Sequence, residues 1–109
     1  MEITYLSEDF AISGQIVPED LPKIRSQGFR SLICARPDGE AADQPSFAEI
    51  QNAAQGFEMR YVPIALTGAT EADHAAFAEA ISDLTGPVLT YCGSGKRAGL
   101  LWQAMKDAQ

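Results

Sequence analysis

The sequence predicts an α/β fold of three layers, in which helices flank a mostly parallel central sheet. Short β-rich runs alternate along the chain with helical segments of about 10–15 residues, a pattern typical of parallel strands joined by crossover helices. Glycines and prolines divide these segments at regular intervals. A chain of 109 residues with 46% apolar residues suits one globular domain, and we expect residues 1–109 to form it.

The first third of the chain begins with two short strands. The runs at residues 3–6 and 10–13 surround a polar turn and predict a hairpin or a pair of edge strands. A helix is expected to begin at Pro18, because proline suits the first helical position, and to end at Gly28, which can adopt the left-handed conformation. The next strand is predicted over residues 29–34.

The rest of the chain continues the alternation of helix and strand. Thr70 is a suitable helix N-cap, and Asp73 three residues later can complete a capping box. Trp102 and Met105 have the helical spacing of core residues. The expected elements are a polar loop over 35–44, a helix from Pro45 to Gly56, a second core strand over 57–64, a helix from Thr70 to Gly86-Pro87, a strand over 88–91 and a helix from Ala98.

The composition limits the classes of partner and cofactor that we expect the chain to bind. Fifteen acidic residues against eight basic ones give a net charge of −7, so neither nucleic acid nor a membrane surface is an expected partner. No apolar run approaches the ~18 residues of a transmembrane helix. The N-terminus lacks signal-peptide features, so a cytoplasmic location is expected. Two cysteines and one histidine suit neither a disulfide scaffold nor a multi-histidine metal site, and we expect no cofactor.

The predicted fold also indicates where a functional site would lie. In parallel sheets, ligands bind beyond the carboxyl ends of the strands. Three loops are expected at that edge, over residues 35–44, 65–69 and 92–97. The third loop contains a cysteine, two glycines and two basic residues.

The segment Tyr91–Gly99, which reads Tyr-Cys-Gly-Ser-Gly-Lys-Arg-Ala-Gly, has the residue types of a covalent-catalysis site. Cys92 follows a buried strand, and Gly93 and Gly95 allow successive amide groups to point into one concavity. These amides, the N-terminus of the following helix and Arg97 would stabilise a thiolate. The same groups can bind an anionic substrate, with Arg97 as a bidentate clamp.

Each of these residues also has a purely structural interpretation. Cys92 could be a small core residue, and the glycines could serve only an ordinary strand-to-helix turn. Ser94 could hydrogen-bond the thiolate or the leaving group, or it could be an ordinary turn serine. Lys96 either adds positive potential to the loop or faces water.

Segment Tyr91–Gly99 resembles the active-site loops of the cysteine phosphatase and rhodanese superfamilies. With further segments, essentially the whole chain resembles the small bacterial family described as beta-lactamase hydrolase-like protein, phosphatase-like domain. Its members occur alone or fused to a metallo-β-lactamase-like persulfide dioxygenase or a sulfide-oxidising flavoprotein. The resemblance implies a dual-specificity-phosphatase-like fold with Cys92 as nucleophile and Arg97 as anion clamp. The further segments are Ser13-Gly14-Gln15, Gly28-Phe29, Ile33-Cys34-Ala35-Arg36-Pro37-Asp38-Gly39-Glu40, Gln44-Pro45 and Tyr61-Val62-Pro63-Ile64.

Departures from the phosphatase pattern favour sulfur transfer as the reaction. Phosphatases of this fold usually have Cys-x5-Arg, a histidine before the cysteine and an acid on an earlier loop. Here Arg97 comes one residue earlier, Tyr91 replaces the histidine, and residues 61–70 contain no acid. Sulfur transfer through a Cys92 persulfide needs no protonated leaving group. The expected substrate is a small anion or a persulfide, and a thiol- or persulfide-handling protein would be a suitable partner.

Two other interpretations stay open. A phosphatase would use the same loop to form a phosphoenzyme at Cys92. A non-catalytic module that binds an anion or a redox partner is favoured by Gly93, which stands where family members commonly have arginine. This glycine lowers the positive charge of the loop.

The loop over residues 35–44 and the strand before it supply further candidates. Arg36 and Asp38 could bind or orient an anionic substrate, and Asp38 could act as acid or base. Glu40 on the same rim could also orient substrate. The alternative for all three residues is a solvated polar turn, and the resemblance favours a functional role for Arg36 and Asp38. Cys34, at the end of the preceding strand, is either a relay thiol or a buried strand residue.

Overall fold

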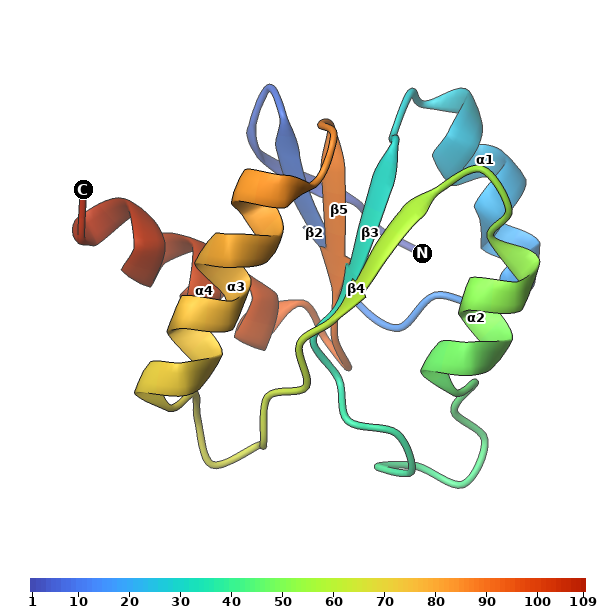
Figure 1. Cartoon of the computed structure of the whole chain (residues 1–109). Coiled ribbons are helices and arrows are strands. Elements are labelled where there is room, and N and C mark those ends of the chain that lie inside the picture. Colours follow the sequence, from blue (N-terminus) through green and yellow to red (C-terminus); the bar gives the residue numbers. More distant parts are fainter.

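The chain forms one five-stranded sheet (Figure 1). A computed structural model describes all residues from 1 to 109. The strands are β1 (Thr4–Ser7), β2 (Phe10–Ser13), β3 (Ser31–Cys34), β4 (Glu58–Tyr61) and β5 (Val88–Tyr91). Their order in the sheet is β1-β2-β5-β3-β4. The pair β1 and β2 is antiparallel, and every other pair is parallel, which confirms the mostly parallel sheet.

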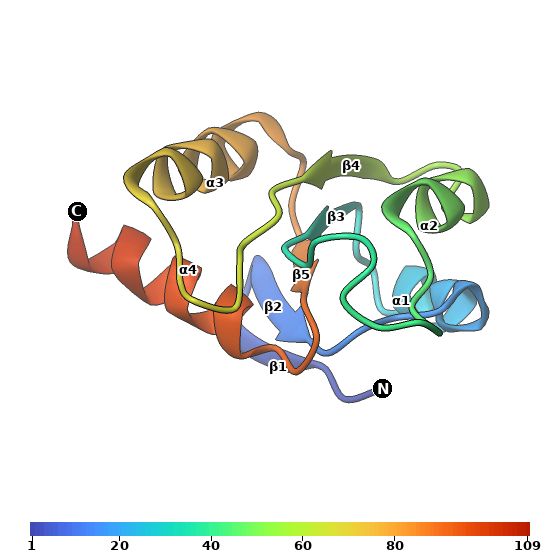
Figure 2. The same cartoon turned by 90° about the horizontal axis from the view of Figure 1, so that it is seen from below.

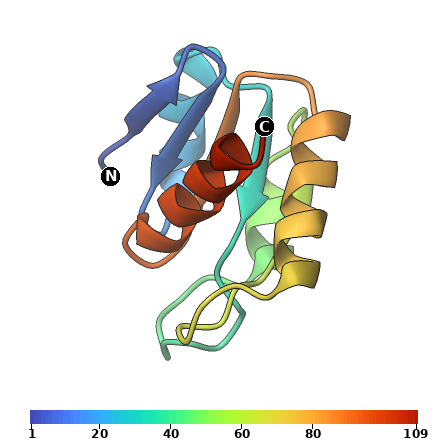
Figure 3. The same cartoon turned by 90° about the vertical axis from the view of Figure 1, so that its left-hand side faces the viewer.

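Helices cover both faces of this sheet and complete the predicted three-layer α/β fold. They are the 3-10 helix η1 (Pro18–Asp20), α1 (Leu21–Ser26), α2 (Phe47–Ala53), α3 (Glu71–Asp83) and α4 (Lys96–Asp107). Figures 1 and 2 show α1 and α2 on one face and α3 and α4 on the other, and Figure 3 looks onto the α3–α4 face. None of the helices combines the length and apolar character that crossing a lipid bilayer requires.

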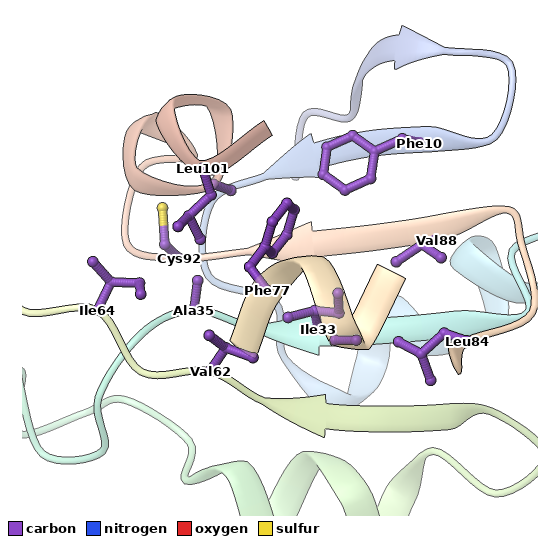
Figure 4. Close-up of a cluster of buried hydrophobic side chains, with 12 residues drawn as sticks. Phe10, Ile33, Ala35, Val62, Ile64, Phe77, Leu84, Val88, Cys92 and Leu101 are labelled. Carbon is purple, nitrogen blue, oxygen red and sulfur yellow. The ribbon is translucent and has the colours of Figure 1, made fainter. Parts of the chain in front are cut away.

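The two faces of the sheet carry separate apolar clusters, because neighbouring residues of a strand point to opposite sides. Ile33 belongs to the cluster beneath α3 and α4, and Cys92 lies in the same cluster (Figure 4). Leu32 and Cys34 belong to the cluster beneath α1 and α2. The side on which a residue lies therefore follows from its position along the strand.

Aromatic side chains of α3 and α4 pack against Phe10 of the sheet. The ring of Trp102 stacks on Phe10 with centroids 4.1 Å apart, and Phe77 meets Phe10 edge-on at 5.9 Å. Met105 is partly buried against the same cluster. Trp102 and Met105 therefore face the core cluster as predicted, but both side chains stay partly exposed.

Three predicted elements need correction. The segment 57–64 is not a core strand: β4 pairs on one side only, its residues are mostly exposed, and only later residues such as Val62 are buried. The helix expected from Pro45 begins at Phe47, because Ser46 caps it by accepting from the Glu49 amide. The last helix begins at Lys96 rather than Ala98, because the chain turns at Gly95 with φ 95°.

Thr70 caps α3 as predicted. Its hydroxyl accepts from the Asp73 amide at 3.1 Å, and the Asp73 carboxylate accepts from the Thr70 amide at 2.9 Å. Thr70→Ala removes one of these bonds and should lower the free energy of unfolding by about 1 kcal/mol in urea titrations. Thr67→Ala, at an exposed loop position, is the matched control and should leave that free energy unchanged. Equal stabilities of the two variants would contradict the capping role.

Candidate active site

The candidate site forms where β5 ends, at the carboxyl edge of the parallel strands. β5 pairs with β2 on one side and β3 on the other, and the Cys92 amide then donates to the Ser13 carbonyl at 3.2 Å. Loops from several strands gather at this edge, as predicted (Figure 2). Arg97 connects them, since it contacts Glu40 from one loop and the Ile64 carbonyl from another.

Cys92 lies at the floor of the loop. It is fully buried, and the Gly95 amide donates to its Sγ at 3.0 Å. The left-handed conformation of Gly95 turns the chain back toward the sulfur and directly precedes α4, whose positive dipole end therefore faces the same place. Four further amides donate to no protein acceptor and so stay available to an anion: those of Gly93, Ser94, Arg97 and Ala98.

Arg97 keeps free donors that face the loop. Its Nη1 donates to Glu40 Oε2 at 2.7 Å and to the Ile64 carbonyl at 2.8 Å, and its Nη2 donates to Glu40 Oε1 at 2.9 Å. Because a guanidinium has five N–H groups, the Nε–H and one Nη2–H remain unused. A Cβ atom on Gly93 would lie 3.2 Å from Nη2, so this edge of Arg97 faces the backbone beside Cys92.

Glu40 is the central acceptor of the site. Its side chain is 15% exposed and also accepts from Arg36 Nε at 2.9 Å, so one carboxylate joins two guanidinium groups. Hydrogen bonds from Arg97, and then from Arg36, hold the pKa of Glu40 below its usual range. The hydrogen bonds that Arg97 donates to Glu40 in turn raise the pKa of Arg97. Both partners therefore stay charged at neutral pH.

Sequence reasoning placed Glu40 on the rim but not among the site residues, and it missed Gln15. The Oε1 atom of Gln15 accepts from Arg36 Nη1 at 3.1 Å. The sequence did contain a signal for Glu40. It stands four residues after Arg36 in the segment Ile33–Glu40, which carries part of the family resemblance. Gln15 belongs to the segment Ser13-Gly14-Gln15, which carries part of the family resemblance, but no local pattern links it to Arg36, 21 positions away in the chain.

Gly93 provides the space in which the two arginines approach the loop. A Cβ atom at this position would lie 3.2 Å from Arg97 Nη2 and 3.5 Å from Arg36 Nε. The loop loses the charge that an arginine at position 93 would bring. Two guanidinium groups from elsewhere nevertheless flank this position.

Two predicted site residues, Asp38 and Ser94, accept hydrogen bonds from backbone amides, and a third, Lys96, makes no side-chain contact of this kind. The Asp38 carboxylate accepts from the Phe47 amide, at the first residue of α2, at 2.8 Å, and its expected role on substrate stays a prediction. The Ser94 hydroxyl accepts from the Lys96 amide at 3.3 Å, as an ordinary turn serine does. Lys96 is exposed and makes no side-chain hydrogen bond or ion pair, so it faces solvent.

Cys34 is a buried strand residue on the other face of the sheet from Cys92. The two thiols belong to different apolar clusters, beneath different helix pairs. The Cys34 thiol donates to the Arg36 carbonyl at 3.3 Å, and burial raises its pKa. This placement favours the structural interpretation of Cys34 over the relay.

The family model described as beta-lactamase hydrolase-like protein, phosphatase-like domain, matches residues 2–109. The chain belongs to this family. Beta-lactamase hydrolase-like proteins from Agrobacterium fabrum and Xylella fastidiosa strain Temecula1 are 36% and 41% identical to it over 104 residues. These matches cover 94% of this chain but 24% of each relative, so the chain spans about a quarter of their length.

Solved structures of similar proteins support the same assignment. A Neisseria meningitidis protein, provisionally assigned as a phosphatase, is 32% identical with a TM-score of 0.87, over 99% of this chain and 78% of that one. The core catalytic domain of a PP-IP phosphatase from S. cerevisiae shares the fold, with a TM-score of 0.76 at 15% identity, over 96% of this chain and 64% of that one. The central sheet with its helices is therefore of the cysteine-phosphatase type.

These findings correct the expected reaction. The sulfurtransferase prediction is wrong, because both the matching family and the similar solved structures are phosphatase-like. The prediction relied on the short spacing from Cys92 to Arg97, on Tyr91 in place of a histidine, and on the lack of an acid in residues 61–70. The structure shows that this spacing still places a backbone amide on the sulfur and the guanidinium beside the loop.

The lowered pKa of Glu40 has a consequence for stability. The ionised carboxylate contributes stability above the pKa of an unfolded glutamate, ~4.3, and this contribution is lost as the pH falls through the lower pKa of the folded state. Glu40→Gln should therefore lower Tm at neutral pH, and the difference from the unchanged chain should shrink toward about pH 3. Thermal unfolding across this range measures it, and a difference that grows on acidification would contradict the ion pair.

Proposed function

We propose that the chain is a cysteine-based phosphatase that hydrolyses phosphate monoesters through a phosphocysteine at Cys92. The observation that carries this proposal is the 3.0 Å hydrogen bond from the Gly95 amide to Cys92 Sγ at the N-terminus of α4, with Arg97 in the first helical turn. Such a setting stabilises a thiolate and binds an anion at the same place. The family assignment as phosphatase-like supports the same reaction.

The groups around Cys92 suit an anionic phosphate ester, because the two arginines exceed the carboxylate of Glu40 by one positive charge. Four free amides and the unused edge of Arg97 supply donors, and Arg36 adds a second positive charge. The net charge of the whole chain is −7, but charges further away than about 10 Å are largely screened at 0.1 M salt. A small anion therefore responds to the local arginines.

The reaction would proceed in two displacements. The Cys92 thiolate attacks phosphorus, so an S–P bond forms while the P–O bond to the leaving group breaks, and the departing oxygen takes a proton from solvent. Water then attacks the phosphocysteine, which releases inorganic phosphate and restores the thiolate. Arg97 and the loop amides stabilise the charge on the phosphoryl oxygens in both transition states.

Replacing the nucleophile tests this proposal directly. Cys92→Ser should reduce hydrolysis of 4-nitrophenyl phosphate to background while retaining affinity for inorganic phosphate, and Arg97→Ala should lower kcat/KM about 10²–10³-fold. Cys34→Ser is the matched control and should retain activity. Phosphate binding without any turnover by the unchanged chain would instead identify an anion-binding module.

The site offers no proton from Glu40, because its lowered pKa keeps it ionised between two arginines. Asp38 is engaged at the start of α2. We therefore expect the rate to depend steeply on the leaving group: phenyl phosphates with more acidic phenols should react faster. The slope of log kcat/KM against the pKa of the phenol measures this dependence, and a flat slope, with chemistry shown to be rate-limiting, would reveal an efficient general acid.

A further inference from the structure

Glu40 and Arg97 meet in a geometry that leaves one edge of the arginine open. The carboxylate binds the end of the guanidinium, through Nη1 at 2.7 Å and Nη2 at 2.9 Å. The second Nη1–H donates to the Ile64 carbonyl. The donors that remain, Nε–H and one Nη2–H, form the side edge, which is suited to two parallel hydrogen bonds with phosphate oxygens.

This contact fixes the direction in which the open edge points. Nη2 lies nearest the position that a Cβ atom on Gly93 would take, so the open edge faces the loop around Cys92. Without its partners, an arginine side chain samples many rotamers. Two acceptors from separate loops, the Glu40 carboxylate and the Ile64 carbonyl, restrict Arg97 to one arrangement.

The same carboxylate also holds the second arginine. Arg36 donates to Glu40 Oε1 through Nε and to Gln15 through Nη1, and its side chain is 15% exposed. The Nε atom lies 3.5 Å from the position of a Cβ atom on Gly93. Glu40 thus keeps two like charges close together beside the loop, where they would otherwise repel each other.

We propose that Glu40 is a positioning residue, which holds Arg97 with its side edge toward the phosphoryl group and keeps Arg36 beside it. This proposal rests on the phosphatase function proposed above. Glu40 acts through the arginines and does not itself touch the substrate. An alternative arrangement, in which Glu40 occupies the place of the substrate phosphate and must leave, makes the opposite prediction for affinity.

The test compares Glu40→Gln with Glu58→Gln in the full chain. Glu58 is a matched control, because it is also a hydrogen-bonded carboxylate with a lowered pKa, but its partner is Thr85 and it contacts no arginine of the site. Glu40→Gln should weaken inorganic phosphate binding about tenfold and lower kcat/KM by a similar or larger factor. Glu58→Gln should change neither quantity beyond about twofold.

Two further measurements exclude a merely structural role. Glu40→Asp should restore part of the lost affinity, because it keeps the charge one methylene further away. In 15N spectra at neutral pH and low temperature, the Arg97 Nη–H signals, which come from the groups that donate to Glu40, should exchange with water faster in Glu40→Gln than in the unchanged chain. Unchanged exchange and affinity in a folded Glu40→Gln protein would overturn the proposal.

The outcomes separate this proposal from the phosphatase function. If Glu40→Gln binds inorganic phosphate more tightly than the unchanged chain, Glu40 is a competitor of the substrate and the positioning role is wrong, whatever the activity. If no Cys92-dependent hydrolysis exists, the phosphatase function is wrong, and phosphate affinity still decides the role of Glu40. An unchanged chain that binds no phosphate would overturn both.

Discussion

The pairing of β5 with a strand on each side is the constraint on which the site depends. All four residues of β5 are buried, and its register places Tyr91 level with Ser13 of β2 and Cys34 of β3. Three chain segments therefore leave the sheet at the same height. A shift of one residue would exchange the faces of Tyr91 and Cys92 and carry the sulfur away from α4.

Local charge and global charge differ in this molecule. The chain is strongly acidic, yet Arg36 and Arg97 lie together beside Gly93 and share a single carboxylate. Considered alone, the active-site loop carries less positive charge than it would with an arginine in place of Gly93. The structure shows that the charge near a short loop also depends on the segments packed against it. The sequence of the loop alone does not show these neighbouring charges.

Much of the fold could be predicted because its signals are local. The spacing of apolar residues, the Thr70 cap and the glycine–proline boundaries each act within a few residues, and these features located the helices and the strands Phe10–Ser13 and Val88–Tyr91. Contacts between distant segments were not predictable in the same way. The bond from the Phe47 amide to Asp38 spans 9 positions of the chain, and the bond from Arg36 to Gln15 spans 21.

The short spacing between Cys92 and Arg97 shows why a loop motif alone does not determine the reaction. α4 begins at Lys96, so Arg97 stands in the first helical turn, and its guanidinium is held by Glu40 and the Ile64 carbonyl from two other segments. The position of the arginine therefore depends on the loop after β3 as much as on the number of residues after the cysteine. A cysteine sulfur among amides and an oriented guanidinium would serve sulfur transfer and phosphate hydrolysis alike. The features that separate these reactions must then lie in the segments around the loop. In this chain those in contact with it include Ser13–Gln15, the segment from Arg36 to Glu40, and Ile64.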